Sequence, residues 1–304
     1  MNPLEQCNLC PRSCGSNRAA GQTGYCGMSA EVKVARASLH MWEEPCISGT
    51  NGSGTVFFTG CPLKCVYCQN RTIAIGSTGE RISIERLSEI FIELQEKGAH
   101  NINLVTPTHY VPQIVKALKI AKEKGLHIPI VYNTGSYEKV ETIQALEGLV
   151  DIYLPDCKYF DSELAAKYSN APDYFKVASD AIEEMVRQVG KPMFEGNLMK
   201  RGVIVRHMIL PGHTKDSRKI IERLYKTYGD DIYISIMNQY TPLPQMKNFP
   251  EINRRITARE YEKVIDYAIS LGIENAFIQE GETAKESFIP DFESGFGIKG
   301  QKEK

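Results

Sequence analysis

The chain has 304 residues, and its 36 Lys and Arg against 37 Asp and Glu give a formal charge of −1. This balance argues against a nucleic-acid-binding module, whose usual mark is a basic excess. The chain is 42% apolar, yet it contains no apolar run near the 18 residues that span a membrane, and its start lacks the pattern of a signal peptide. We therefore expect a cytoplasmic protein of one large or two ordinary domains, with neither a nucleic-acid nor a membrane partner.

Cysteine is the most informative residue type. The chain has 9 cysteines, and all but Cys157 lie before residue 69. Because a long chain without an export signal keeps its thiols reduced, clustered cysteines indicate metal binding more than disulfides. Residues 1–53 combine five of these thiols with several glycines and little periodicity, so we interpret them as a cysteine-rich, metal-binding leader.

Beyond residue 53, short apolar runs alternate with helical patterns. The sequence predicts strands at 55–59, 102–105, 128–132, 151–154, 202–210 and 231–237, and a last one at 276–279. It predicts helices at 84–98, 112–125, 137–146, 161–189 (broken near Pro172), 215–228 and 257–271. Such alternation indicates an α/β fold with a parallel sheet covered by helices, either curled into a barrel or open. We place this domain at 54–285 and a C-terminal tail at 286–304.

The strongest motif follows the first of these strands. Cys61, Cys65 and Cys68 have the spacing C-x3-C-x2-C on one loop. Three such thiolates can hold three corners of an iron–sulfur cubane and leave the fourth iron open, as catalytic zinc sites leave a coordination position open. Zinc favours pairs of cysteines on separate turns, so a lone triplet suits it poorly. The alternatives are three structural cysteines or half of a zinc site.

Around the triplet, the sequence resembles the radical S-adenosylmethionine (SAM) superfamily. It is more closely similar to the pyruvate formate-lyase activating enzymes, which carry F-F-x-G-C before the triplet and C-x-N-R after it. The matching residues are Phe57, Phe58, Gly60, Cys61 and 68–71. The resemblance covers about residues 54–280 and implies a partial (β/α)6 barrel. The leader is similar to that of an uncharacterised branch of activating-enzyme homologues.

The resemblance also implies the chemistry. Cys61, Cys65 and Cys68 would bind a 4Fe–4S cluster, and SAM would chelate its open iron. One-electron reduction would then yield a 5′-deoxyadenosyl radical that abstracts a hydrogen atom. A low-potential electron donor, flavodoxin or ferredoxin, and a protein or peptide substrate are implied as partners. The alternatives are a small-molecule substrate, or a zinc or iron–sulfur binding module without radical chemistry.

Polar residues at the ends of the second and third strands are candidates to bind SAM, because active sites of parallel barrels lie at the carboxyl ends of strands. Activating enzymes carry Gly-Gly-Glu after the second strand, near the SAM amino group. Here Thr106, Thr108 or His109, or backbone carbonyls, must replace it, although Thr108 equally suits a helix cap. At the end of the third strand, Asn133 and Thr134 resemble part of a D-T-N-G-F stretch of the activating enzymes, with Asn133 in place of the Asp.

The fourth and fifth strands supply charged candidates. Asp156 and Lys158 resemble a D-x-K stretch that contributes to a monovalent-cation site, and Asn133 in place of an acid puts that cation in doubt. The alternative is an Asp156–Lys158 salt bridge that closes the barrel. Arg206 matches an arginine near the SAM carboxylate, and a carboxylate partner suits an arginine in an apolar strand. His207 points to the other face and is interpreted as a packed histidine.

The remaining cofactor-binding candidates lie in the sixth strand and in the motif. Met237 shares a face with Ser235 and Gln239, in a region that lies near adenine in the family, although barrel core with a polar rim explains the pattern equally well. Tyr67 and Asn70, within the motif, complete the expected cofactor-binding set.

The leader holds a second set of thiols at Cys7, Cys10, Cys14 and Cys26. Four thiolates suit either zinc or a second iron–sulfur cluster that relays electrons; the C-x2-C spacing favours zinc. The alternative is four buried cysteines.

The segment between leader and barrel carries the only Trp, Trp42, with Glu43 and Glu44. These residues either contact substrate or form a packed Trp with two solvated acids, and we favour the second. Cys46 and Cys157 have no assigned role.

Overall fold

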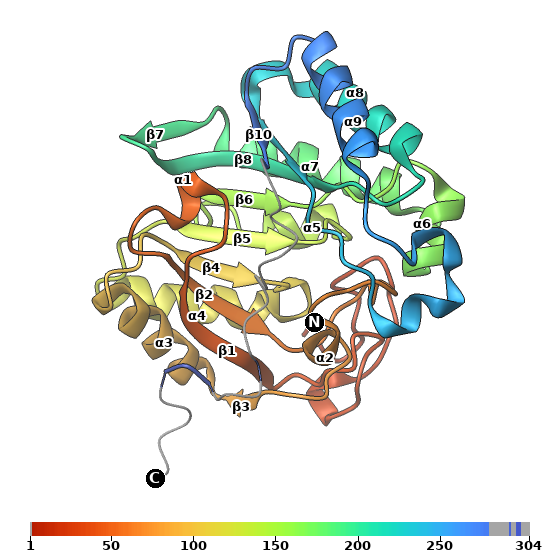
Figure 1. Cartoon of the computed structure of the whole chain (residues 1–304). Coiled ribbons are helices and arrows are strands. Elements are labelled where there is room, and N and C mark those ends of the chain that lie inside the picture. The colour runs from red at the N-terminus through yellow and green to blue at the C-terminus, as the bar shows by residue number, and fades with distance from the viewer. Residues whose placement is uncertain (1, 280–291, 293–295, 299–304) are drawn as a thin grey trace.

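A computed structural model describes residues 2–279, 292 and 296–298, and its centre is an open, largely parallel sheet (Figure 1). The strand order is β10-β9-β8-β6-β5-β4-β2-β1-β3. The parallel strands are β2 (Ser53–Phe58), β4 (Ile102–Val105), β5 (Ile130–Thr134), β6 (Ile152–Pro155), β8 (Leu198–Met208), β9 (Tyr233–Met237) and β10 (Ala276–Ile278). The sheet is curved but not closed, so the expected partial barrel is confirmed, and every predicted strand exists within a few residues of its expected bounds.

Three strands were not predicted, and all three pair antiparallel with the rest. They are β1 (Val32–His40) and β3 (Glu80–Ile82) at one edge, and β7 (Met193–Glu195) beside β8. Strand β1 lies within the segment interpreted as an irregular leader. It is stabilised by pairing with β2 and by burial of Val34 and Ala37 in the core, which are tertiary effects that local periodicity does not show. The division at residue 53 remains a prediction.

Helices cover the outer face of the sheet. The longer ones are α3 (Ile84–Glu96), α4 (Val111–Glu123), α6 (Ser162–Ser169), α7 (Tyr174–Val189), α8 (Thr214–Tyr228) and α9 (Ala258–Ser270), with the short α5 (Val140–Gln144) between them. Most present one apolar stripe to the sheet, as α3 does with Leu87, Phe91 and Leu94, whereas α6 packs Ala165 and Tyr168 against the cysteine loop. The predicted break near Pro172 separates α6 from α7, because Asn170 ends α6 in the left-handed conformation.

Two short helices and five single 3-10 turns complete the described elements. The helices are α1 (Pro45–Ser48) and α2 (Arg71–Ala74), and the turns are η1 (Arg18–Ala20), η2 (Thr108–Tyr110), η3 (Gly229–Asp231), η4 (Pro244–Asn248) and η5 (Pro250–Ile252). Helix α1 packs Cys46 and Ile47 against strand residues that include Val131, Leu154 and Ile204. It therefore fills part of the inner face of the sheet and leaves the carboxyl ends of the strands free for a cavity.

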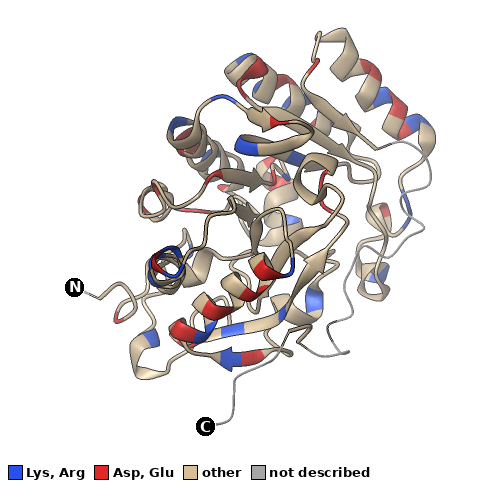
Figure 2. Cartoon of the chain, turned by 90° about the vertical axis from the view of Figure 1, so that its left-hand side faces the viewer, with Lys and Arg blue, Asp and Glu red and all other residues tan. Residues whose placement is uncertain are grey.

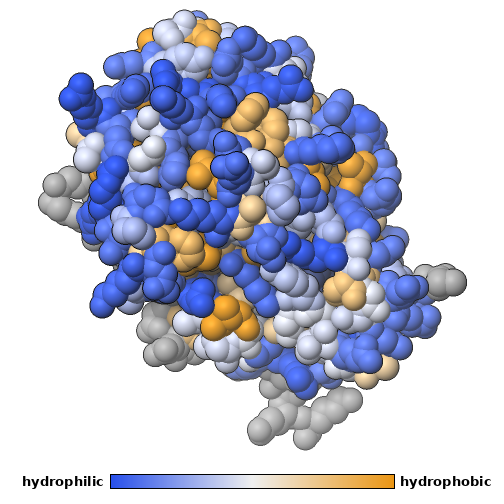
Figure 3. Space-filling view, turned by 90° about the vertical axis from the view of Figure 1, so that its right-hand side faces the viewer, coloured by the Kyte–Doolittle hydropathy of each residue, from blue (hydrophilic) through white to orange (hydrophobic). Residues whose placement is uncertain are grey.

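The surface agrees with the balanced composition. Acidic and basic residues are interspersed along the elements in Figure 2, and the face in Figure 3 is mostly hydrophilic with separate hydrophobic groups. No helix in the described part of the chain has the length and apolarity needed to cross a membrane. Most of the predicted C-terminal tail, 286–304, lies outside the described residues; of its described members, Phe292 packs on Phe57, and the Phe296 carbonyl accepts a hydrogen bond from Ala37 N.

Candidate active site

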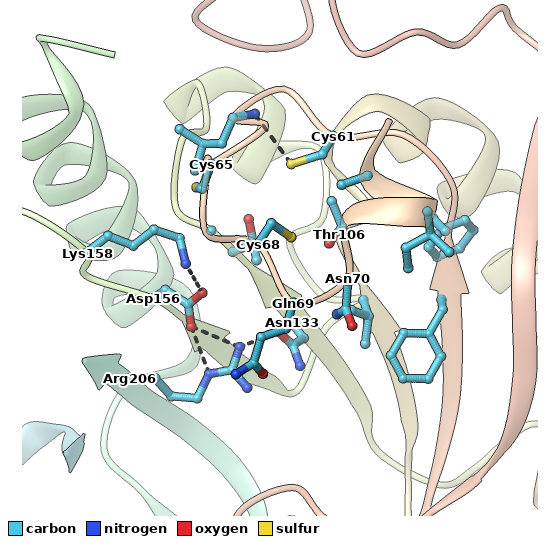
Figure 4. A pocket seen from close by; sticks show the side chains of 18 of the residues that line it. Cys61, Cys65, Cys68, Gln69, Asn70, Thr106, Asn133, Asp156, Lys158 and Arg206 are labelled. Carbon is cyan, nitrogen blue, oxygen red and sulfur yellow. Dashed lines mark hydrogen bonds and ion pairs between the residues drawn. The ribbon is translucent and has the colours of Figure 1, made fainter. Parts of the chain in front are cut away.

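A cavity of about 260 Å³ opens at the carboxyl ends of the parallel strands, and the motif cysteines lie in its wall (Figure 4). Most of the residues predicted to bind the cluster or SAM line this cavity. They are Cys61, Cys65, Cys68, Tyr67, Asn70, Thr106, Thr108, Asn133, Thr134, Asp156, Lys158, Arg206 and Met237. The structure thus brings together side chains from six strand ends that lie far apart in the sequence, although their individual roles remain predictions.

The cysteine loop leaves β2 through a sharp turn at Gly60. Gly60 has φ +93°, and a Cβ at this position would lie 2.4 Å from Met28 Cγ. Only glycine satisfies both the left-handed conformation and the close approach. Beyond the turn, Leu63 N lies 3.4 Å from Cys61 Sγ, and the Ser169 hydroxyl donates to Cys65 Sγ at 3.0 Å. Hydrogen bonds of this kind orient cluster ligands and tune a cluster's potential.

The three motif thiols are close enough to affect one another's ionisation. Burial, followed by the charge of Cys65, raises the pKa of Cys61 to about 11. Burial, followed by Cys65 and Cys61, raises the pKa of Cys68 to about 12. Neighbouring buried thiols resist becoming thiolates together unless cations bind them, so this site suits a polynuclear metal group.

Three thiols that line one cavity suit a cluster. All three cysteines are free. Across residues 2–279, no three His, Cys, Asp or Glu side chains are placed to hold one metal ion. In a 4Fe–4S cluster each thiolate binds a different iron, so the sulfurs do not need to surround one point. Three thiols facing one cavity can therefore hold three irons and leave the fourth facing the remaining space.

Opposite the cysteines lies a buried network of charges from β6 and β8. Lys158 Nζ is 2.6 Å from Asp156 Oδ2, and Arg206 Nε donates to Asp156 Oδ1 at 2.9 Å (Figure 4). Burial alone would raise the pKa of Asp156, but Arg206 and then Lys158 outweigh it and hold that pKa below its ordinary value. Asp156 is therefore an anion held between two cations, and the Asp156–Lys158 ion pair offered as the structural alternative is present.

Glu43 belongs to this network, which corrects the preference for a solvated acid. Its side chain is only 9% exposed, and its Oε2 lies 3.2 Å from Arg206 Nη1. Its Oε1 accepts hydrogen bonds from Asn103 Nδ2 at 3.0 Å and Asn133 Nδ2 at 3.3 Å. The neighbouring Glu44 is also buried. The local sequence around Glu43 and Glu44 gives no sign that these acids are buried. The burial of Glu43 depends on Arg206, which lies more than 160 residues away in the chain.

Glu43 and Arg206 lie where the resemblance to activating enzymes implies a monovalent-cation site. Arg206 Nη2 donates to Asn133 Oδ1 at 2.6 Å, so its guanidinium lies among Asn133, Asp156 and Glu43. Glu43 thus places a carboxyl group beside the position where Asn133 replaces an acid; burial raises the pKa of this group, and Arg206 opposes that effect. In this chain the positive charge among these groups is the guanidinium itself, whose pKa is raised by the surrounding acids against the effect of burial.

A second buried carboxylate, Glu138, was missed by sequence reasoning. Thr108 Oγ1 donates to its Oε1 at 2.6 Å, and the hydroxyl of Thr134 donates to the same oxygen. The N-cap of η2 is Pro107 and that of α4 is Tyr110, so Thr108 does not occupy a cap position. Glu138 is 2% exposed, and burial raises the pKa of its carboxyl group. No charge pattern marks this single acid in the sequence.

Some candidates lie elsewhere. His109 does not line the cavity; its Nε2 is 2.8 Å from the Thr59 carbonyl. Ser235 is buried beneath the site, whereas Met237 and Gln239 reach the cavity, so the three do not share one environment. His207 is buried with Nδ1 2.7 Å from the Cys157 carbonyl, as a packed histidine would be.

These features define a class: an open parallel β/α sheet that carries a three-cysteine loop after its first parallel strand and a cavity at the strand ends. Residues 55–224 match the family described as the Radical SAM superfamily, which is more than half of the chain. The protein belongs to the radical SAM superfamily. Membership implies a 4Fe–4S cluster and SAM, and the three free thiols fit that cluster.

Two curated relatives match different shares of this chain. The uncharacterised protein MJ0674 of Methanocaldococcus jannaschii is 29% identical over 88% of this chain and 75% of its own length. The pyruvate formate-lyase-activating enzyme of Staphylococcus aureus is 22% identical over 55% of this chain and 65% of its own length. The similarity to activating enzymes expected from the motif is therefore found, over a limited part of both chains.

Solved structures support the fold. Streptococcus suis SuiB bound to the precursor peptide SuiA matches with a TM-score of 0.50 at 17% identity, over 74% of this chain and 48% of SuiB. HydG, a maturase of the [FeFe]-hydrogenase, matches with a TM-score of 0.51 at 15% identity, over 74% of this chain and 51% of HydG. The chain spans about half the length of these structures, so the likeness concerns the fold alone.

Proposed function

We propose that this protein cleaves SAM reductively to a 5′-deoxyadenosyl radical and uses it to abstract hydrogen from a protein or peptide, as glycyl-radical activating enzymes do. The observation that carries the proposal is the placement of three free thiols opposite a charged network across one cavity. When bound, the cluster supplies the electron that splits the sulfonium bond. The chain's own residues bind, orient and shield the reactants.

Each wall of the cavity has a separate task in this proposal. Cys61, Cys65 and Cys68 hold the cluster. Arg206 is positioned by Asp156 and by Glu43 to reach the SAM carboxylate, for which a guanidinium is well suited. Thr106 and Thr108 lie at the end of β4, where the amino group is expected, and Met237 lies on the wall assigned to adenine.

The aromatic residues behind the cysteine loop exclude water. Tyr159 OH donates to Tyr67 OH at 2.7 Å, and the Tyr67 ring contacts those of Tyr159, Tyr168 and Tyr240. Tyr67, Tyr159 and Tyr240 are nearly fully buried. Their layer closes the rear of the loop, so a radical formed in the cavity meets substrate before solvent.

A peptide substrate is favoured by the rim of the cavity. Trp42 and His40 line it, and Leu39, Met41 and Trp42 are exposed apolar side chains on the same segment, 37%, 45% and 53% exposed respectively. An exposed apolar strip beside a catalytic cavity suits an extended polypeptide more than a small polar molecule. The similarity to an activating enzyme supports the same choice. A flavodoxin or ferredoxin is the proposed electron donor.

The test is anaerobic reconstitution with iron and sulfide, followed by reduction and quantification of 5′-deoxyadenosine. We expect the wild type to form product and Cys65→Ala to form none, while Cys46→Ala, a buried free cysteine outside the cavity, keeps the activity. Undiminished product in Cys65→Ala would contradict the cluster assignment. A colourless protein that holds only zinc and fails to bind SAM would instead support a binding module.

A further inference from the structure

The leader thiols are gathered in space as well as in sequence. A Cβ at Gly24 would lie 3.2 Å from Cys14 Sγ and 3.5 Å from Cys26 Sγ. Cys14 hydrogen-bonds to the side chain of Cys7, and electrostatic interactions link Cys10 with both Cys7 and Cys26. All four are free. Thiols about 20 residues apart in the chain do not converge by chance in a segment with so little regular structure.

The part of the leader that holds the four thiols, residues 2–31, has little apolar core of its own. Its separate cluster contains Leu4, Cys7 and Leu9 with Ala30 packed against it, Cys26 and Met28 join the main core, and its one described helical element is the turn η1. Small segments with few apolar contacts often need a metal or disulfides to hold one conformation. Since the cysteines form no disulfide, a bound metal would supplement the contacts that this segment makes with the barrel.

A buried cation among the thiols gives independent support. Arg18 is fully buried, and within the described part of the chain its hydrogen bonds go to the carbonyl oxygens of Met28, Ser29 and His109, and to Cys7 Sγ at 3.7 Å. None of these partners carries a carboxylate. A buried guanidinium requires a nearby negative charge. Four thiolates on one divalent ion carry a net charge of −2 and would supply it.

The turns that carry the thiols suit zinc. Cys10 begins one turn, in which Ser13 N donates to the Cys10 carbonyl at 3.0 Å, and Cys26 lies within another, in which Gly27 N donates to the Gly24 carbonyl at 2.9 Å. Cysteines on separate turns are typical of closed, four-coordinate zinc sites. Among residues 2–279 no three of these sulfurs already surround one point, so binding requires side-chain rotation at two or more of the four cysteines.

We propose that Cys7, Cys10, Cys14 and Cys26 bind one structural zinc ion, and that the zinc-bound leader supports the Gly60–Cys68 loop from behind. Contacts at Gly60 and Pro62 join the leader to the loop. Cys26 O and Met28 pack directly on Gly60, and Arg12, between Cys10 and Cys14, donates from Nε to the Pro62 carbonyl at 2.9 Å.

Arg12 also links the leader to a cluster ligand through Ser169. Arg12 Nη2 donates to the Ser169 carbonyl at 2.8 Å, and the Ser169 hydroxyl donates to Cys65 Sγ. The guanidinium stacks 4.3 Å from the centre of the Tyr25 ring, next to Cys26. An ion that fixes Cys10, Cys14 and Cys26 therefore fixes the residues that hold both sides of the loop.

Metal counts on the full-length protein test the site. In Cys61→Ala/Cys65→Ala/Cys68→Ala, we expect about one zinc per chain and no iron. In Cys7→Ser/Cys10→Ser, we expect zinc to fall to near zero and cluster iron to be lost faster during gel filtration. Cys46→Ser, also buried and free, is the matched control and is expected to keep both metals.

X-ray absorption at the zinc edge of the wild type keeps the test decisive even if a leader variant fails to fold. Four sulfur ligands at about 2.3 Å support the proposal. Nitrogen or oxygen ligands, or far less than one zinc, overturn it. About four irons in the variant without the motif cysteines would overturn zinc in favour of a second cluster. If Cys7→Ser/Cys10→Ser loses zinc but retains iron as the wild type does, the proposal that the leader supports the Gly60–Cys68 loop is overturned.

Discussion

Glu43 and Arg206 are 163 residues apart in sequence, and their side chains meet at 3.2 Å on the inner face of the sheet. Glu43 lies on the connection between β1 and α1, and Arg206 lies in β8. The contact joins a segment that precedes the barrel to the strand expected to bind SAM. It also explains why a buried arginine is tolerated there, since Glu43 and Asp156 together balance its charge.

Glu43→Ala is expected to lower the free energy of unfolding by roughly 1–3 kcal/mol, because the buried Arg206 guanidinium and the Asn103 amide each lose a hydrogen-bond partner. Glu147→Ala is the control: its ion pair with Arg187 is exposed on both sides, so losing it is expected to cost little. Thermal and urea unfolding of the cofactor-free proteins measure both changes. Equal destabilisation by the two variants would contradict a specific role for Glu43.

Lys158→Met is expected to lower the reduction potential of the cluster. The Lys158 ammonium interacts electrostatically with the motif thiols, and a nearby positive charge favours the added electron. An interaction of about 1 kcal/mol corresponds to about 40 mV for one electron. Redox titration followed by electron paramagnetic resonance measures the potential. Lys64→Met, on the same loop but stacked on Tyr25, is the control and is expected to shift it less.

Gly60→Ala is expected to destabilise the protein by more than about 2 kcal/mol and to reduce cluster retention. The added Cβ would have a positive φ and would lie 2.4 Å from Met28 Cγ. Gly125→Ala separates these two causes, because Gly125 has φ +99° and an added Cβ there would meet nothing within 4 Å. We expect about 1 kcal/mol at Gly125 from backbone strain alone. Thermal unfolding and iron content measure both variants, and equal effects would rule out the contact with the leader.

Glu138→Gln is expected to change how stability depends on pH. Burial raises the pKa of Glu138 above the ordinary 4.5, so the folded state binds its proton more tightly than the unfolded state does. The stability contributed by this group is therefore present at low pH and is lost as pH rises above 4.5. Relative to the wild type, Glu138→Gln is expected to become progressively more stable as the pH rises from 4.5 to 7. Parallel stability curves across this range would contradict the assignment.

Much of the architecture followed from local patterns. The strands that became β2, β4, β5 and β6 are short apolar runs between amphipathic helices, and a buried parallel strand needs nothing else to be recognised. Strand β1, which lies between β2 and the edge strand β3, was missed, because its stability comes from pairing with β2 and from core contacts that the local sequence does not show.

The site divides in the same way. By itself, the sequence determined the cysteine triplet and the polar strand ends, because fixed spacing on one loop and the common direction of parallel strands bring those groups to one edge of the sheet. Only the tertiary structure decided that Glu43 and Glu138 are buried members of the site, and that the leader lies against Gly60. The physical reason is that the burial and charge of a side chain depend on partners brought close by the fold, and their distance along the chain carries no trace of that proximity.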